Sequence, residues 1–194
     1  ESMSRAPWVL PKNEKPFPAG DQTLASTTLG WRLVNPRMPK EWTVSLGEAT
    51  EQLREKYGIS RERQDEFAAR SHEQAARAWD EGRYDNLTVA VDGAELARDE
   101  SIRAGSTVEK LATLKTVFRP VSDSPAGGTV TAGNASPLND GASAAWLGSE
   151  AAAGILGLEP LARIAGRGAA ANEPQYFGYA PVEAANTAIK RAGI

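Results

Sequence analysis

The chain has 194 residues, is 41% hydrophobic and 24% charged, and carries a formal net charge of −3 at neutral pH. This composition is typical of a folded globular protein, and the mildly acidic charge argues against nucleic acid or an anionic membrane as a partner. No apolar run approaches the ~20 residues that a membrane span requires. The sequence contains no cysteine and one histidine, His72, which excludes thiol nucleophiles, disulfides and zinc–thiolate sites among these residues, and we predict no metal site.

The first residues carry information about processing and location. Residues 1–7 lack the basic start and the apolar core of a secretory signal, so we expect a cytoplasmic protein. Because the sequence opens on Glu1 and not on methionine, we expect it to be a piece of a longer protein. Residues 1–44 are dense in proline, which predicts an extended arm without a long helix.

Two consecutive helices are predicted next. Apolar or small residues at helical spacing indicate a helix over residues 46–57 that ends at Gly58. Ser60 is a good N-cap for a second helix that ends at Gly82, and His72 is expected on its solvated flank. The predicted buried faces consist of Leu46, Ala49, Thr50, Leu53 and Tyr57 in the first helix, and of Phe67, Ser71, Ala75 and Trp79 in the second.

The rest of the chain alternates predicted strands and helices. Strands are expected at residues 87–91, 129–131, 142–147 and 161–165. A capping box over residues 106–109 predicts a short helix through Leu114. Ser149 is expected to cap a helix over residues 150–156, and Pro181 to begin a last helix that runs to Ala192. This alternation predicts an α/β protein.

A loop of small residues joins the strands predicted at 129–131 and 142–147. It reads Ala132-Gly-Asn-Ala-Ser136 and continues through Asn139-Asp140-Gly141. Glycine and asparagine tolerate positive φ, and the lack of bulk lets a ligand or a second segment come close. The pattern alone favours a tight connection between strands over a binding loop, and both readings stay open at this point.

The small-residue loop belongs to a longer motif. The stretch Thr129-Val-Thr-Ala-Gly-Asn-Ala-Ser136 with Leu138-Asn-Asp-Gly-Ala142 resembles the signature of the thiolase family, the acyl-CoA acetyltransferases that cleave or condense 3-oxoacyl-CoA. Residues 1–7, the helix at Ser60 to Ala68 and the segment from Phe177 to Val182 resemble further family motifs in the same order. Residues 27–36 resemble the 3-oxoadipyl-CoA thiolase subgroup of aromatic-compound breakdown.

The resemblance implies a thiolase-like αβαβα fold, of which this chain holds only the loop domain and part of the N-terminal half. Residues 1–3 would end a strand of the N-terminal half, residues 4–138 would form the loop domain that covers coenzyme A, and residues 139–194 would return to the N-terminal α/β core. The chain would be a central piece, because the nucleophilic cysteine of the family precedes it and the second cysteine and the Gly-His-Pro histidine follow it.

The resemblance also implies which residues hold substrate. No residue of this chain is expected to be catalytic, and coenzyme A is expected as a substrate and not as a bound cofactor. Phe177 would lie beside the acyl pocket. The expected coenzyme A contacts are Ser136, whose hydroxyl would bond a pantetheine amide, Ala132, Phe118 and Leu46 along the pantetheine arm, and Arg103 and Lys110 near the adenine or phosphate end.

The resemblance implies an acyltransferase that works through a cysteine acyl-enzyme, as a homodimer or homotetramer at full length, while the 194-residue piece alone would be inactive. The alternative is a non-catalytic module of the same fold that binds coenzyme A or an acyl carrier. A nucleotide-binding protein is a weaker alternative, because neither a Gly-x-Gly-x-x-Gly nor a Walker pattern occurs.

Overall fold

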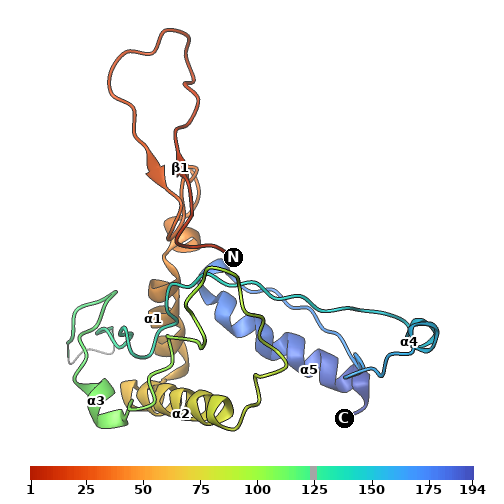
Figure 1. The fold of residues 1–194 in the computed structure, drawn as a ribbon. Coiled ribbons are helices and arrows are strands. Elements are labelled where there is room, and N and C mark those ends of the chain that lie inside the picture. Colours follow the sequence, from red (N-terminus) through yellow and green to blue (C-terminus); the bar gives the residue numbers. More distant parts are fainter. Residues whose placement is uncertain (123–125) are drawn as a thin grey trace. The chain divides into compact units, whose positions relative to one another are not determined.

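A computed structural model describes residues 1–122 and 126–194 and divides the chain into two compact units. One unit consists of residues 46–137, and the other combines residues 1–45 with residues 138–194 (Figure 1). Each unit is described by itself. The assignment of these residues to a loop domain and an α/β core stays a prediction.

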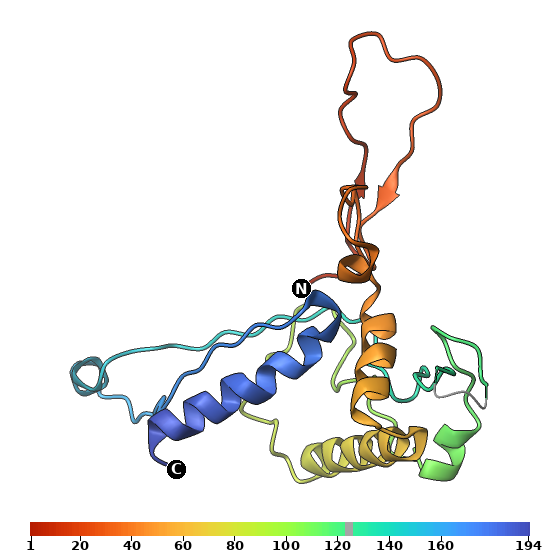
Figure 2. The ribbon, with the colours of Figure 1, turned by 180° about the vertical axis from the view of Figure 1, so that it is seen from behind.

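The unit of residues 46–137 contains α1 (Leu46–Tyr57), α2 (Arg61–Asp80) and α3 (Val108–Ala112). The predicted bounds of α1 and the predicted cap of α2 are confirmed, since the hydroxyl of Ser60 accepts a hydrogen bond from the backbone N–H of Arg63. The predicted capping box is wrong by one residue, because Thr107 and not Ser106 caps α3. Figure 2 shows α1 and α2 crossing at a steep angle.

The buried faces of α1 and α2 differ from the predicted ones. Leu46 is 67% exposed and Phe67 is 65% exposed, whereas Glu51 and Asp65 are almost completely buried. Of the predicted residues Ala49 is buried, at 3% exposure, so apolar spacing identified the helices and only part of their buried faces. Polar side chains take the interior positions because hydrogen-bond donors from residues 129–134 meet them there, as described below.

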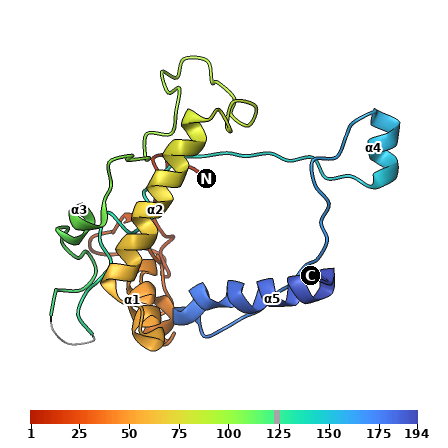
Figure 3. The same cartoon turned by 90° about the horizontal axis from the view of Figure 1, so that it is seen from below.

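The second unit contains two short strands and four helical segments. Strand β1 (Trp8–Val9) pairs antiparallel with β2 (Ala25–Ser26), with Trp8 opposite Ser26. The helical segments are the 3₁₀ helix η1 (Lys40–Thr43), α4 (Glu150–Leu156), the 3₁₀ helix η2 (Pro174–Tyr179) and α5 (Ala180–Ala192). Helix α4 has the predicted bounds and caps, and it lies at the end of two long segments without secondary structure (Figure 3).

The small residues before η2 have a packing role. A Cβ atom at Gly166 or Gly168 would overlap a backbone carbonyl oxygen of α5, that of Ala188 or Ala184 respectively. The guanidinium of Arg191 on α5 also donates a hydrogen bond to the carbonyl oxygen of Arg167, at 2.9 Å. These glycines therefore allow the chain to lie directly on the backbone of α5.

The predicted strands at residues 87–91, 142–147 and 161–165 are not strands in this structure. Residues 129–131 form a single bridge, between Thr131 and Thr116. A strand needs a neighbour for its backbone hydrogen bonds, and the described part of the chain supplies none for these segments. The turn expected at Asn139-Asp140-Gly141 is also different, because Asp140 pairs with Ser2 and accepts hydrogen bonds from the backbone and side chain of Ser4.

Burial is uneven between the two units. The buried apolar side chains of the described residues are Ala49, Ala76, Leu111 and Val130, all of them within residues 46–137. No residue of the unit formed by 1–45 and 138–194 is buried, and Trp146 and Leu161 are fully exposed. Among the described residues, no helix combines the length and the apolar character needed to cross a membrane.

Candidate functional site

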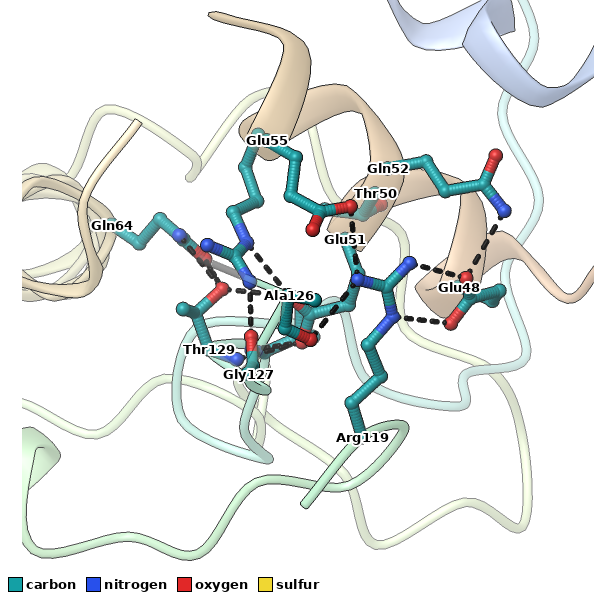
Figure 4. Close-up of polar contacts among 12 residues, drawn as sticks. Glu48, Thr50, Glu51, Gln52, Glu55, Gln64, Arg119, Ala126, Gly127 and Thr129 are labelled. Carbon is teal, nitrogen blue, oxygen red and sulfur yellow. Dashed lines mark hydrogen bonds and ion pairs between the residues drawn. The ribbon is translucent and has the colours of Figure 1, made fainter. Parts of the chain in front are cut away.

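The small-residue loop of residues 129–136 is held at its first residues by α1. The backbone N–H groups of Thr129 and Val130 donate hydrogen bonds to Oε1 of Glu51, at 2.7 and 2.8 Å, and the hydroxyl of Thr129 donates to Oε2, at 2.9 Å. Gln64 of α2 donates a further bond to the Thr129 hydroxyl, at 3.0 Å. The Glu51 carboxylate, with 0% exposure, therefore fixes the entry to the loop (Figure 4).

The charge of Glu51 is balanced from the same helix. Nε of Arg54 donates to Oε2 of Glu51 at 3.1 Å, and the Arg54 guanidinium also donates to the carbonyl oxygen of Gly127. Burial by itself would raise the pKa of Glu51, but the bonds from Val130, Thr129 and Arg54 outweigh it and lower the pKa below its ordinary value. Glu51 is therefore ionised at neutral pH.

The end of the turn is held by α2. Nδ2 of Asn134 donates to Oδ1 of Asp65, at 2.9 Å, while Oδ1 of Asn134 accepts from the backbone N–H of Thr131, at 2.8 Å. Nε of Arg61 donates to the other oxygen of Asp65, at 2.7 Å, and its Nη2 donates to the carbonyl oxygen of Leu111 in α3, at 2.6 Å. One buried carboxylate thus links the loop, α2 and α3.

A third set of ion pairs, around Arg119, holds the segment of Val117 to Arg119, which pairs with the loop. Arg119 donates to Glu48 at 2.8 Å and to Glu55 at 3.0 Å, so it joins two carboxylates that lie about two turns apart on α1 (Figure 4). The bond from Arg119 lowers the pKa of Glu48, and the two carboxylates raise the pKa of Arg119. The segment pairs with the loop through the backbone N–H of Val117, which donates to the carbonyl oxygen of Val130, at 2.9 Å.

The structure brings together two of the residues predicted along the pantetheine arm. The ring of Phe118 lies on the backbone of α1 at Gly47, where a Cβ atom would overlap it, and Leu46 is the adjacent residue. Phe118 is 42% exposed and Leu46 is 67% exposed, so both present apolar surface. Their role as contacts of the pantetheine arm stays a prediction.

The chain neighbours of Ala132 and Lys110 pack against each other. Gly133, next to Ala132, packs on the side chains of Leu111 and Leu114, which a Cβ atom would overlap. Lys110 precedes Leu111 in α3, and its Nζ donates to the carbonyl oxygen of Gly105, at 2.8 Å. The glycine serves close packing here, as its lack of a Cβ atom allows, and its φ is not positive.

Arg103 has an exposed side chain and an anchored backbone. Its N–H donates to Nδ1 of His72 on α2, at 3.3 Å, and Gly105, the acceptor of the Lys110 bond, lies two residues further on. His72 is half-buried and accepts this exposed hydrogen bond, so it lies on the surface of α2 and also anchors the backbone of Arg103. Arg103 and Lys110 therefore lie on one stretch of chain, which the bond from Lys110 to Gly105 closes on itself.

Ser136 and Phe177, the predicted pantetheine and acyl-pocket contacts, are not among the predicted site residues that the described structure brings together. Ser136 is exposed after the turn, and Phe177 is 49% exposed in η2, in the other unit. A hollow lined by Glu1, Gly141, Ala142 and Ser143 lies in that second unit and includes none of the predicted contacts. The contacts with coenzyme A remain predictions.

Sequence reasoning missed the residues that position the loop, namely Glu48, Glu51, Arg61, Asp65, Arg119 and Asn134. A usable signal was present in α1, where carboxylates at 48, 51 and 55 repeat at helical spacing on one face. Such a stripe is usually solvated. Here it faces Arg119, Thr129 and Val130 and carries the interior hydrogen bonds.

These carboxylates predict an acid-sensitive fold. The pKa of Glu48 and of Glu51 is lowered from 4.5 in the folded chain, so each stabilises the folded state above the unfolded pKa, and this contribution is lost as pH falls through the folded pKa. We expect the penalty of Glu51→Gln in the free energy of unfolding to be larger at pH 7 than at pH 3. Thermal unfolding at constant ionic strength measures it, with the exposed Glu66→Gln as control; an equal penalty at both pH values would contradict the assignment.

Comparison with known proteins identifies the family of the chain. Residues 1–151 match the model of the thiolase N-terminal domain. The chain therefore belongs to the thiolase family, and its fold is that of the N-terminal part of a thiolase.

Individual relatives extend the match over the whole chain. The 3-oxoadipyl-CoA/3-oxo-5,6-dehydrosuberyl-CoA thiolase of Escherichia coli K12 is 41% identical over 100% of this chain and 49% of its own length. The solved acetyl-CoA acetyltransferase of Bacillus anthracis has a TM-score of 0.78 at 35% identity, covering 100% of this chain and 48% of the other. Human mitochondrial 3-ketoacyl-CoA thiolase, solved with CoA, has a TM-score of 0.79 at 29% identity, over 99% and 46%. The chain spans about half the length of the relatives it matches.

Proposed function

We propose that this chain is the coenzyme A-holding part of a longer thiolase-type acyltransferase, and that the chemistry belongs to residues outside these 194. The observation that carries the proposal is the loop of residues 129–136, which two buried carboxylates fix while the predicted ligand contacts around it stay exposed. Exposed side chains on a rigidly held loop are suited to binding a ligand. The human relative solved with CoA supports coenzyme A as that ligand.

The proposed reaction explains why residues outside the chain are needed. In thiolysis an enzyme thiolate attacks the 3-oxo carbonyl, the bond between C2 and C3 breaks, and acetyl-CoA leaves after protonation of its carbanion. A second coenzyme A then attacks the acyl-enzyme thioester and restores the thiolate. The chain contains no cysteine, so it cannot form this intermediate.

The lack of burial in one unit supports the same proposal. No residue of the unit formed by 1–45 and 138–194 is buried, and apolar side chains such as Trp146 and Leu161 are fully exposed. Surfaces of this kind normally pack against further protein. We propose that the rest of the parent polypeptide covers them and supplies neighbours for the predicted strands, and that the parent is a cytoplasmic homodimer or homotetramer.

The substrate class is proposed from the relatives. The Escherichia coli relative that matches the whole chain is named for 3-oxoadipyl-CoA, in agreement with the resemblance of residues 27–36 to that subgroup. We therefore propose a 3-oxoacyl-CoA with a carboxylated acyl chain, as met in aromatic catabolism. The alternative of a non-catalytic binding module shares the coenzyme A contacts and differs in having no turnover at full length.

Binding of coenzyme A tests the proposal. In calorimetric titration of the intact protein, Ser136→Ala is expected to raise the Kd for coenzyme A about fivefold, which corresponds to one hydrogen bond of about 1 kcal/mol. Ser71→Ala, an exposed serine on α2, is the matched control and should leave Kd unchanged. A wild-type protein that binds no coenzyme A would overturn the proposed function, whereas unchanged Kd in Ser136→Ala would overturn only the role of Ser136.

A further inference from the structure

Two buried carboxylates from different helices meet the same short loop. Glu51 of α1 is 0% exposed and holds Thr129 and Val130, and Asp65 of α2 is 1% exposed and holds Asn134. Between them, Thr131 is 0% exposed. The backbone on both sides of Ala132 is thus fixed, although Ala132 itself is exposed.

Asp65 also connects this loop to α3. It accepts from Arg61, whose guanidinium donates to the carbonyl oxygen of Leu111 at 2.6 Å. Leu111 follows Lys110, and its side chain packs at Gly133. The same carboxylate therefore sets the position of the loop that carries Ala132 and of the helix that carries Lys110.

We propose that Asp65 and Glu51 are positioning residues for coenzyme A. Asp65 is the one that holds the loop of residues 129–136, which carries the proposed pantetheine contact Ala132, and α3, which carries the proposed adenine-side contact Lys110, in a fixed relation. This inference rests on the proposed function, because it concerns the same coenzyme A contacts. Neither carboxylate touches the substrate in this account. Their charges are balanced by ion pairs with Arg54 and Arg61, and the two carboxylates act on the ligand contacts only through the loop and α3.

Asp65→Asn is the informative variant. The asparagine has the same size as the aspartate, but one of the two carboxylate oxygens is replaced by an NH₂ group. That group then faces a hydrogen-bond donor, either Asn134 or Arg61, and one of the two bonds is lost. The loop and α3 are then no longer held together. In the intact protein we expect the KM for coenzyme A to rise about tenfold while kcat changes less than about threefold, because the lost interaction concerns holding and not the reacting atoms. Glu66→Gln, the exposed neighbour on α2, is the control and should change neither constant.

A double-mutant cycle separates positioning from general damage to the fold. If Asp65 acts through its bond to Asn134, then Asp65→Asn with Asn134→Ala should raise KM no more than the larger of the two single changes. If the effects of the two changes on KM were additive, Asp65 would not act through its bond to Asn134. Thr129→Val is the replacement test if Asp65→Asn does not fold. It removes one hydrogen-bond donor to Glu51 and keeps the shape of the side chain, and it is expected to raise the KM for coenzyme A about threefold.

The outcomes are distinct for the two proposals. Wild-type protein without saturable coenzyme A dependence would overturn the proposed function. Wild-type protein that saturates normally, together with folded Asp65→Asn or Thr129→Val variants of unchanged KM, would overturn the positioning role and leave the proposed function standing. A lower kcat at unchanged KM would also contradict positioning.

Discussion

Replacing Glu51 by alanine is expected to destabilise the fold by about 3–5 kcal/mol, because the change removes a buried, paired carboxylate. It leaves the backbone N–H groups of Thr129 and Val130 without their acceptor, and it leaves the Arg54 guanidinium, whose side chain is 11% exposed, without its counter-charge.

Chemical unfolding of the intact protein, combined with amide hydrogen exchange, measures this effect. The amides of Thr129 and Val130 should lose their protection first, because Glu51 is their direct acceptor. Glu66→Ala, the same change at an exposed position of α2, should stay within about 0.5 kcal/mol of wild type. Equal stabilities of Glu51→Ala and Glu66→Ala would show that the carboxylate is not needed.

Local signals predicted the helices well. The bounds of α1 and α4 were correct because their start and end depend on neighbouring residues: Ser149 accepts from the N–H of Ala152, and Gly157 adopts the left-handed conformation that ends α4. The last helix was predicted to begin at Pro181 and begins one residue earlier, at Ala180. No information from distant residues was required for these predictions.

The buried faces could not be predicted in the same way. Glu51 lies 78 residues before its partner Thr129, and Asp65 lies 69 residues before Asn134. Nothing near Glu51 in sequence distinguishes it from a solvated glutamate. The predicted strands failed for a related reason, since a strand is completed only by a neighbour, and segments such as 161–165 have none among the described residues.

The candidate site was predicted in part. The family resemblance proposed Leu46 and Phe118 together, and the structure brings the ring of Phe118 to the residue next to Leu46. It also proposed Ala132 and Lys110, whose chain neighbours Gly133 and Leu111 pack against each other. The residues that hold these contacts in place were missed, because their roles depend on tertiary hydrogen bonds.

The second large effect concerns turnover. We expect the isolated 194-residue chain to show no thiolysis of a 3-oxoacyl-CoA, at least about a millionfold below the intact protein, because enzymatic rate enhancements begin near that factor and the chain has no thiolate to acylate. The assay follows loss of the 3-oxoacyl-CoA in the presence of coenzyme A, with the intact protein as the positive control. Turnover by the isolated chain would contradict the prediction directly.

The location of the acyl-enzyme tests the central claim independently of whether the isolated chain folds. The intact protein is incubated with a 3-oxoacyl-CoA in the absence of free coenzyme A, digested, and searched by mass spectrometry for the peptide that carries the acyl group. We predict acylation of a cysteine outside these 194 residues, released again when coenzyme A is added. An acyl group that is found on a residue of this chain and is released by coenzyme A would contradict the account.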